Sequence, residues 1–244
     1  MKTYRLLNSK INALSKKELL DFVDLKIKNN EKAQISTVNN EFLVEANSNE
    51  KFQKVLAKSD LSIADSTGVV WAINRLYHDK IDRLPGADIF MSLCELSRNK
   101  GYRIFILGGE RGAGKQTKQK LIKMFFGIHI VGVIDDVKVN ENNQNDEIIS
   151  EINKARPNIV FVALGAPKQE IWISNFKHLI SANIFIGIGG TLDYVSGRVK
   201  RAPKFMRELG LEWLFRLFAQ PSRIKRIYNA TVVFPMLVIM KRKL

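Results

Sequence analysis

Short apolar runs alternate along the chain with longer segments in which apolar residues recur at helical spacing. The apolar runs are nearly continuous, which is typical of strands that are buried on both faces of a parallel sheet. Six runs are predicted as strands, at residues 33–38, 61–64, 102–107, 128–134, 158–164 and 183–188. Their alternation with helices predicts an α/β, Rossmann-like fold, a mostly parallel sheet with helices on both faces.

The segments between the strands carry helix signals. Ser15 and Glu18 form a capping box, and Leu19, Val23 and Ile27 follow on one helical face. Further helices are predicted at residues 41–58, 67–77, 87–97, 115–124, 145–154 and 167–179. Ligands of such sheets bind beyond the carboxyl ends of the strands, so the residues that follow each strand are the first candidates for function.

The alternation ends in the glycine-containing stretch 189–197, and two basic helical segments follow, at 203–218 and 221–231. Residues 198–244 hold 12 of the 39 Lys and Arg but only two of the 24 Asp and Glu, so they carry ten of the 15 net positive charges. We therefore divide the chain into a Rossmann-like catalytic core, 1–197, and a basic helical C-terminal appendage, 198–244. Such a basic block predicts a polyanionic partner.

Aromatic side chains are mixed with the cations of the appendage, as at Phe205, Trp213 and Phe218. This mixture suits a helix lying in a membrane interface, where each cation near anionic headgroups contributes about 1 kcal/mol. Nucleic-acid binding would use the same charges, and a packed helix with a solvated basic face is the simplest alternative. The apolar tail 232–240 favours lipid, although Pro235 interrupts it and it is too short to span a bilayer.

The single cysteine, Cys94, excludes a disulfide framework and a thiolate metal cluster. The N-terminus has no apolar segment of signal-peptide length. Both features favour a cytoplasmic protein. The three histidines show no ligand spacing, and no Asp-x-Asp motif occurs, so the usual metal–diphosphate clamp is missing. The nearest acidic pair, Asp135-Asp136, is predicted to lie in a solvated loop.

Polar residues follow the first two strands. Asp65 comes directly after 61–64 and is either a helix N-cap or a general base for a substrate hydroxyl. Thr37 and Asn39 lie at the end of the preceding strand. They could bind sugar or nucleotide hydroxyls, and they could equally be cap residues.

A glycine-rich turn follows the third strand. Residues 109–115 match the first seven positions of a phosphate-binding P-loop, but Gln116 stands where Ser or Thr should hold Mg²⁺, which argues against an ATPase. The turn is also not a regular dinucleotide fingerprint, which argues against a dehydrogenase. Its backbone N–H groups could approach a phosphate-bearing ligand, and a purely structural tight turn is the alternative.

The segment 165–170 places Pro167 at a helix start, with Lys168 and Gln169 in the first turn, able to reach an anion or a sugar. Glu170 is either a second acid or simply a favourable first-turn charge.

Taken together, these segments resemble the WecG/TagA/CpsF family, glycosyltransferase family 26. Each segment alone is weakly specific, but in this order they are highly specific. The matching segments are residues 37–39, 64–70, 107–109, 164–170, 187–193, 196–204 and 209–216.

The resemblance implies an inverting glycosyltransferase. It would transfer N-acetylmannosamine or a related sugar from a UDP-sugar donor to an undecaprenyl-diphosphate-linked GlcNAc acceptor. It would need no metal or other cofactor and no nucleic acid, and it would lie on the anionic inner face of the cell membrane. The appendage would contact that membrane and help to complete the active site. The sequence leaves a homo-oligomer open.

The resemblance also assigns roles to residues. Asp65 corresponds to the family's proposed base, and the other catalytic positions fall on Thr37, Gln169 and Arg83. Asp193 matches an acidic position near the nucleotide. The predicted substrate-binding residues are Asn39, Gly108, Gly109, Lys168 and Asp193 in the core and Arg216, Arg223 and Arg226 in the appendage.

Three features depart from the family pattern. Val38 stands where Pro is common, Ser66 stands where Gly or Ala is common, and the tail after Asn229 is more apolar. They bear on donor and acceptor identity more than on the reaction class. The alternative from another class is a basic nucleotide- or nucleic-acid-binding module on a Rossmann-like core.

Overall fold

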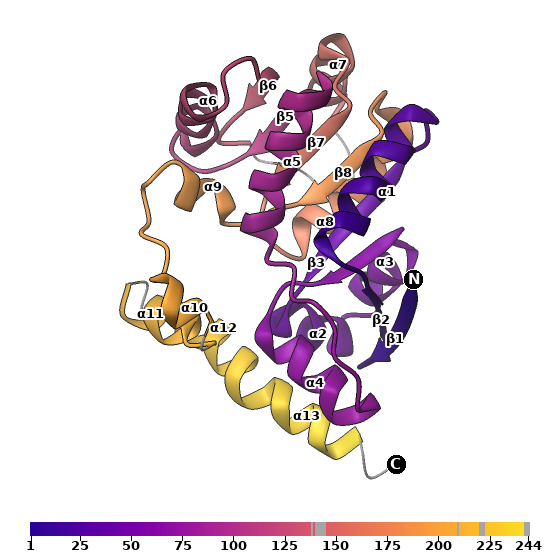
Figure 1. The fold of residues 1–244 in the computed structure, drawn as a ribbon, viewed down its shortest axis with the longest axis vertical. Coiled ribbons are helices and arrows are strands. Elements are labelled where there is room, and N and C mark those ends of the chain that lie inside the picture. The colour runs from indigo at the N-terminus through magenta and orange to yellow at the C-terminus, as the bar shows by residue number, and fades with distance from the viewer. Residues whose placement is uncertain (138, 140–144, 209, 220–222, 242–244) are drawn as a thin grey trace.

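The structure is a computed structural model that describes residues 1–137, 139, 145–208, 210–219 and 223–241 (Figure 1). A parallel sheet of six strands forms its centre, in the order β4-β3-β8-β7-β5-β6. This sheet confirms the predicted Rossmann-like class. Its strands are β3 (Ala33–Val38), β4 (Leu61–Ala64), β5 (Arg103–Gly108), β6 (His129–Ile134), β7 (Ile159–Ala163) and β8 (Ile184–Gly187).

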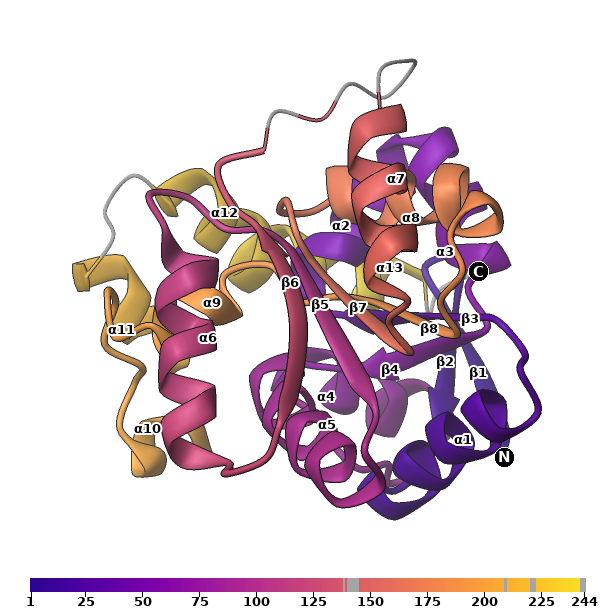
Figure 2. The ribbon, with the colours of Figure 1, turned by 90° about the horizontal axis from the view of Figure 1, so that it is seen from above.

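Helices cover both faces of the sheet (Figure 2). On one face, α1 (Lys16–Lys28), α5 (Gly86–Lys100) and α6 (Ala113–Met124) bury their apolar sides in a core cluster, which includes Cys94 as expected. On the other face, α7 (Asp146–Ala155) and α8 (Lys168–Phe176) pack around Trp172.

A third cluster lies at the β4 end of the sheet. It contains residues of α2 (Asn40–Ser48), α3 (Glu50–Lys58) and α4 (Thr67–Tyr77) together with an N-terminal hairpin. The hairpin, β1 (Lys2–Leu6) and β2 (Ser9–Ala13), is absent from the sequence prediction. Its turn residues, Leu7 and Asn8, both have positive φ, and Leu-Asn is not the Asn-Gly pair that usually signals such a turn.

Two predicted helices are broken in the structure. The helix expected over 41–58 ends at Asn49, whose side chain accepts a hydrogen bond from the Phe52 N–H and starts α3. Asn often competes with the helix in this way. The helix expected over 203–218 is divided into α10 (Lys204–Glu208) and α11 (Glu212–Ala219), with Gly210 at a φ of 74° between them. A short helix, α9 (Thr191–Val195), was not predicted.

The end of the chain runs back across the core as α12 (Ile224–Tyr228), a π-helical turn (Asn229–Val233) and α13 (Phe234–Lys241). The π-helical turn ends two residues before Pro235, which lacks the N–H that a continuous α-helix would need. Phe234 and Val238 are buried in the cluster with α2 and α4, whereas Met236 is exposed. The apolar tail therefore packs on the core with one face.

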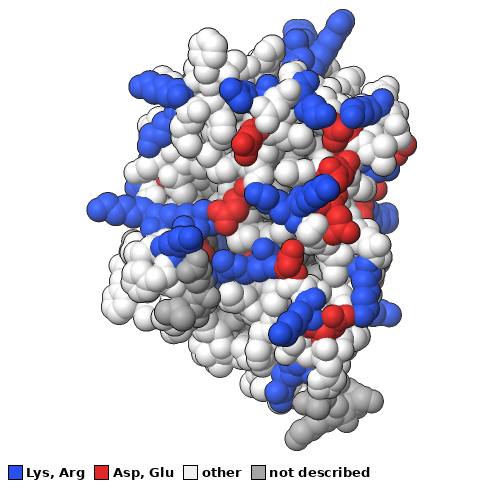
Figure 3. All heavy atoms as spheres, in the orientation of Figure 1, with Lys and Arg blue, Asp and Glu red and all other residues white. Residues whose placement is uncertain are grey.

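No helix within the described ranges is long and apolar enough to cross a membrane. On the face shown in Figure 3, Lys and Arg side chains gather where the chain leads from α9 into α10, with acidic side chains beside them. The division at residue 198 stays a prediction, but the appendage is docked on the core.

Candidate active site

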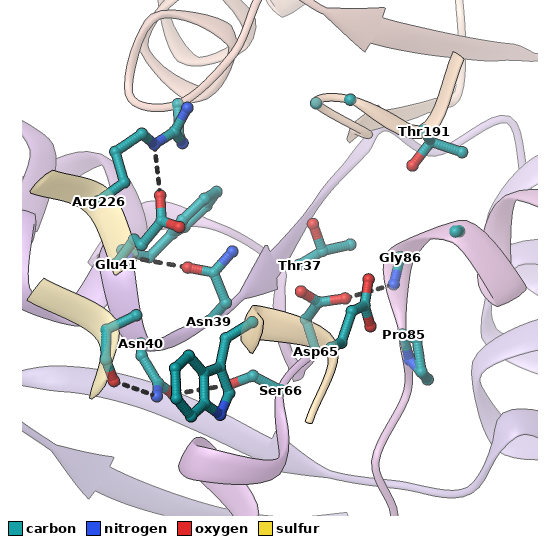
Figure 4. A pocket seen from close by; sticks show the side chains of 18 of the residues that line it. Thr37, Asn39, Asn40, Glu41, Asp65, Ser66, Pro85, Gly86, Thr191 and Arg226 are labelled. Carbon is teal, nitrogen blue, oxygen red and sulfur yellow. Dashed lines mark hydrogen bonds and ion pairs between the residues drawn. The ribbon is translucent and has the colours of Figure 1, made fainter. Parts of the chain in front are cut away.

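A pocket of about 270 Å³ opens at the carboxyl ends of β3, β4, β7 and β8 (Figure 4). Residues that follow each of these strands line it, together with the start of α5, and α11, α12 and the π-helical turn supply a further wall. The appendage thus forms part of the pocket. Of the predicted site residues, the pocket brings together Thr37, Asn39, Asp65, Arg83, Gln169, Arg223 and Arg226.

Asp65 is held between the end of β4 and the start of α5. Its backbone N–H donates to the Val38 carbonyl (2.9 Å), and its Oδ1 accepts from the Gly86 N–H (2.5 Å). The N-cap of α4 is Ser66 and not Asp65, so the N-cap interpretation of Asp65 is wrong for the helix that follows it. The carboxylate is half-buried and faces the pocket with a fixed orientation.

Thr37 and Asn39 lie on the adjacent strand end. The buried Thr37 hydroxyl donates to the Gly187 carbonyl at 3.1 Å, which ties β3 to β8. The side chain of Asn39 accepts from the Phe42 N–H and so caps α2, as the cap alternative predicted. Figure 4 shows Thr37, Asp65 and Gly86 close together on one side of the pocket.

Gln169 reaches the pocket from the first turn of α8. Its Oε1 accepts from the Gly189 N–H (3.0 Å), and its Nε2 donates to Glu170 Oε1 (2.7 Å). Glu170 is completely buried, so it is not a solvated first-turn charge. Burial disfavours the charged carboxylate and raises the pKa of Glu170 to about 8.

Among the described side chains, four arginines line the pocket. Arg226 pairs with Glu41 at 2.6 Å, and Arg83 donates to the backbone carbonyl of Arg207 at 3.0 Å. Arg201, which the sequence reasoning did not single out, pairs with Asp88 at 2.6 Å. The basic run 198–204 was the signal for it. The side chain of Arg216 lies outside the described part of the structure.

The appendage is also tied to the helix that follows Asp65. Asn40 accepts from the Ser66 hydroxyl (2.7 Å) and donates to the Ala230 carbonyl in the π-helical turn (2.8 Å). A Cβ at Gly68 would lie 2.3 Å from Asn40, so only glycine leaves room for this bridge. Ser66, one of the departures from the family pattern, thus belongs to the contact that docks the appendage.

The glycine turn lies outside this pocket, and its approach to the substrate stays a prediction. It follows β5, and β3, β8 and β7 separate that strand from β4, so at about 4.8 Å per strand the turn is roughly 20 Å from Asp65. Neither Gly108 nor Gly109 lines the pocket.

Carboxylates of the chain itself occupy the amides of the turn. The N–H groups of Gly114 and Lys115 donate to Asp135 at 2.7 and 2.9 Å, and those of Arg111 and Gly112 donate to Asp136 at 2.5 and 3.3 Å. The acidic pair is therefore a structural part of the turn and not a freely solvated loop. The structural alternative for the P-loop-like segment is favoured.

Lys168 is exposed outside the pocket. Asp193 is half-buried beside the pocket, next to Gly190. Burial raises the pKa of Asp193, and the positive charges of Arg198 and Arg223 oppose this shift. A nucleotide role for Asp193 stays a prediction. Within the described residues, no group of three or more His, Cys, Asp or Glu side chains could hold a metal ion.

Comparison with known proteins decides the class of the chain. A model described as the Glycosyl transferase WecG/TagA/CpsF family matches residues 4–244. The chain belongs to the WecG/TagA/CpsF family. Membership confirms the predicted glycosyltransferase class and does not favour the alternative of a basic nucleic-acid-binding module.

Two relatives of this glycosyltransferase are named N-acetylglucosaminyldiphosphoundecaprenol N-acetyl-beta-D-mannosaminyltransferase. The protein of Bacillus spizizenii is 33% identical over 222 residues, which cover 86% of this chain and 85% of the relative. The protein of Bacillus subtilis strain 168 is 36% identical over 198 residues, which cover 81% of this chain and 75% of the relative.

Proposed function

We propose that this WecG/TagA/CpsF-family glycosyltransferase transfers N-acetylmannosamine from a UDP donor to an N-acetylglucosamine-diphosphoundecaprenol acceptor. The names of two relatives at 33% and 36% identity support this acceptor and this sugar. One observation carries the mechanism: the Asp65 carboxylate shares a pocket with Arg83, Arg223 and Arg226. A base and cations in one pocket are what a transfer with a diphosphate leaving group requires.

In the proposed reaction, an acceptor hydroxyl attacks the anomeric carbon of the donor from the face opposite UDP. The new C–O bond forms as the bond to the UDP oxygen breaks, so the configuration inverts. Asp65 takes the proton of the attacking hydroxyl. General-base assistance of this kind contributes about 10²–10⁴-fold.

The departing UDP carries the developing negative charge. The arginines that line the pocket would stabilise it, because fixed cations cost no reorganisation at the moment of reaction. We propose that these side chains serve in place of a metal. Turnover should therefore be unchanged by EDTA, and a loss that Mg²⁺ or Mn²⁺ restores would contradict this part of the mechanism.

The test of the proposed base is the variant Asp65→Asn. The amide oxygen of the introduced side chain could still accept from the Gly86 N–H, so the variant should fold and bind UDP as the wild type does. UDP release should fall at least about 100-fold with a UDP-sugar panel and a lipid-diphosphate-GlcNAc acceptor. Asp82→Asn, an exposed carboxylate three residues before Pro85, is the matched control. Near-normal turnover of a folded Asp65→Asn protein would remove Asp65 from the role of base.

We further propose that the appendage binds the anionic inner face of the cell membrane. Large apolar side chains are exposed on it beside cations, and they include Phe205, Trp213, Phe218, Ile224 and Tyr228. This arrangement suits an interfacial helix that brings the pocket to a lipid-linked acceptor.

A further inference from the structure

A buried acid lies directly behind the pocket. The side chain of Glu170 has no exposed surface, and its Oε1 accepts from Gln169 Nε2 at 2.7 Å. Its second oxygen, Oε2, has no hydrogen-bond partner among the described residues. A fully buried acid next to a pocket residue needs a reason, because burial of an unpaired polar group is unfavourable.

The amide of Gln169 is held at both ends. Glu170 accepts from its nitrogen, and the Gly189 N–H donates to its oxygen at 3.0 Å. An amide nitrogen carries two hydrogens and an amide oxygen has two lone pairs. One donor and one acceptor site of Gln169 are thus left for a ligand in the pocket, with their directions fixed.

The neighbouring strand is shaped for this pair of side chains. A Cβ at Gly187 would lie 2.3 Å from Glu170 Oε1 and 2.4 Å from Gln169 Nε2. Only glycine leaves room for both groups against the backbone of β8. The same residue accepts from the Thr37 hydroxyl through its carbonyl, so β8 supports two pocket residues at once.

The described groups that contact Glu170 are uncharged. Gln169 contributes an amide, β8 contributes the backbone of Gly187, and from β3 the Gln34 amide donates to the Glu170 backbone carbonyl at 3.3 Å. A charged side chain is reached only through Gln34: its backbone N–H donates to Asp60, and Asp60 forms an ion pair with Lys177. No charged side chain in the described structure is among the causes that shift the Glu170 pKa.

We propose that Glu170 is a positioning residue, which holds the Gln169 amide so that it presents one donor and one acceptor to a hydroxyl or acetamido group of the sugar. This role rests on the proposed function. It adds a residue behind the pocket to the side chains that touch the substrate. At neutral pH the acid is uncharged, because its pKa is raised to about 8. Above that pH a buried charge would form. The hydrogen bond from Gln169 favours the carboxylate, but no cation of the described structure pairs with it, so the buried charge would destabilise the packing that holds Gln169 in place.

Three variants test this role. Glu170→Leu removes the acceptor and should lower kcat about threefold to tenfold, the loss expected for one hydrogen bond, while UDP affinity is kept. Glu170→Gln can still accept from Gln169 and should recover kcat at pH 7. The wild type should lose kcat above pH 8, and Glu170→Gln should abolish this loss. Glu151→Gln, an exposed glutamate on α7, is the control and should keep the wild-type pH profile.

A second readout does not depend on turnover. The side-chain ¹⁵N resonance of Gln169 should titrate with a pKa near 8 in the wild type and should not titrate in Glu170→Gln. If the chain transfers no sugar but this titration is seen, the proposed function fails and the link between the two side chains stands. If kcat of Glu170→Gln falls above pH 8 as in the wild type, or if Gln169 does not titrate in the wild type, the positioning role is wrong. The Glu170→Gln profile decides the question even if Glu170→Leu does not fold.

Discussion

The anchor of the appendage can be tested at Phe234. This side chain is completely buried in the cluster with α2 and α4, and Phe234→Ala should cost about 3–5 kcal/mol. At about 1.4 kcal/mol per factor of ten, the ratio of docked to undocked α13 should fall by roughly two to nearly four orders of magnitude. The remaining ties of this segment include the buried Val238, the Asn40 bridge and the Arg226–Glu41 pair.

Hydrogen exchange of residues 224–241, measured without membranes, reports this ratio directly. Met236→Ala is the matched control, because Met236 lies on the same helix with 58% of its surface exposed. Protection should be lost in Phe234→Ala and kept in the control, with the central strands unchanged in both. Equal exchange in the two variants would refute the anchoring role. Faster exchange throughout the sheet would show that α13 unfolds only with the whole protein.

Three other outcomes are expected. Phe218→Asp should weaken co-sedimentation with anionic vesicles. Phe126→Asp, at a 91% exposed side chain after α6, should leave co-sedimentation unchanged. An equal loss of vesicle binding in both variants would contradict membrane binding through the appendage. The pKa of Glu170 is raised from 4.5 to about 8 in the folded protein, so the wild type should lose stability relative to Glu170→Gln as pH rises from 4.5 to 8. The loss should reach roughly 5 kcal/mol in denaturant titrations. A stability difference that does not change with pH would refute the raised pKa. Gly114→Ala should destabilise the protein, since its Cβ would lie 2.3 Å from Asp135, and should leave UDP affinity unchanged; weakened binding would return the turn to the site.

The strands and the polar residues at their ends could be predicted because both are local features of the chain. A nearly continuous apolar run is visible in the sequence, and Thr37, Asp65 and Gln169 each lie at or shortly after the end of one. The order of the strands depends on pairings between distant segments. The chain therefore gave no sign that β5 lies three strands beyond β3, far from Asp65.

The sequence also could not predict which side chains bind the backbone N–H groups of the glycine turn. The turn after β5 has the glycines of a phosphate site, but the anion that it binds is supplied by Asp135 and Asp136, some twenty or more residues later. The role of Gly187 has the same origin, because it depends on which side chains come within reach after folding. The break at Asn49 is local, since Asn49 accepts from the Phe52 N–H three residues later. The resemblance supplied the reaction class, and only the fold separated pocket residues from structural ones.

The docked tail has a consequence for the protein's synthesis. Arg223 and Arg226 line the pocket, and the side chains that fasten this wall, Phe234 and Val238, come later still. All six strands of the central sheet precede these side chains in the chain, so the strands are synthesised before the pocket can be finished. A proteolytic cut just before Phe234 would separate the strands from the side chains that fasten this wall, so activity should be lost although the cut lies outside the sheet.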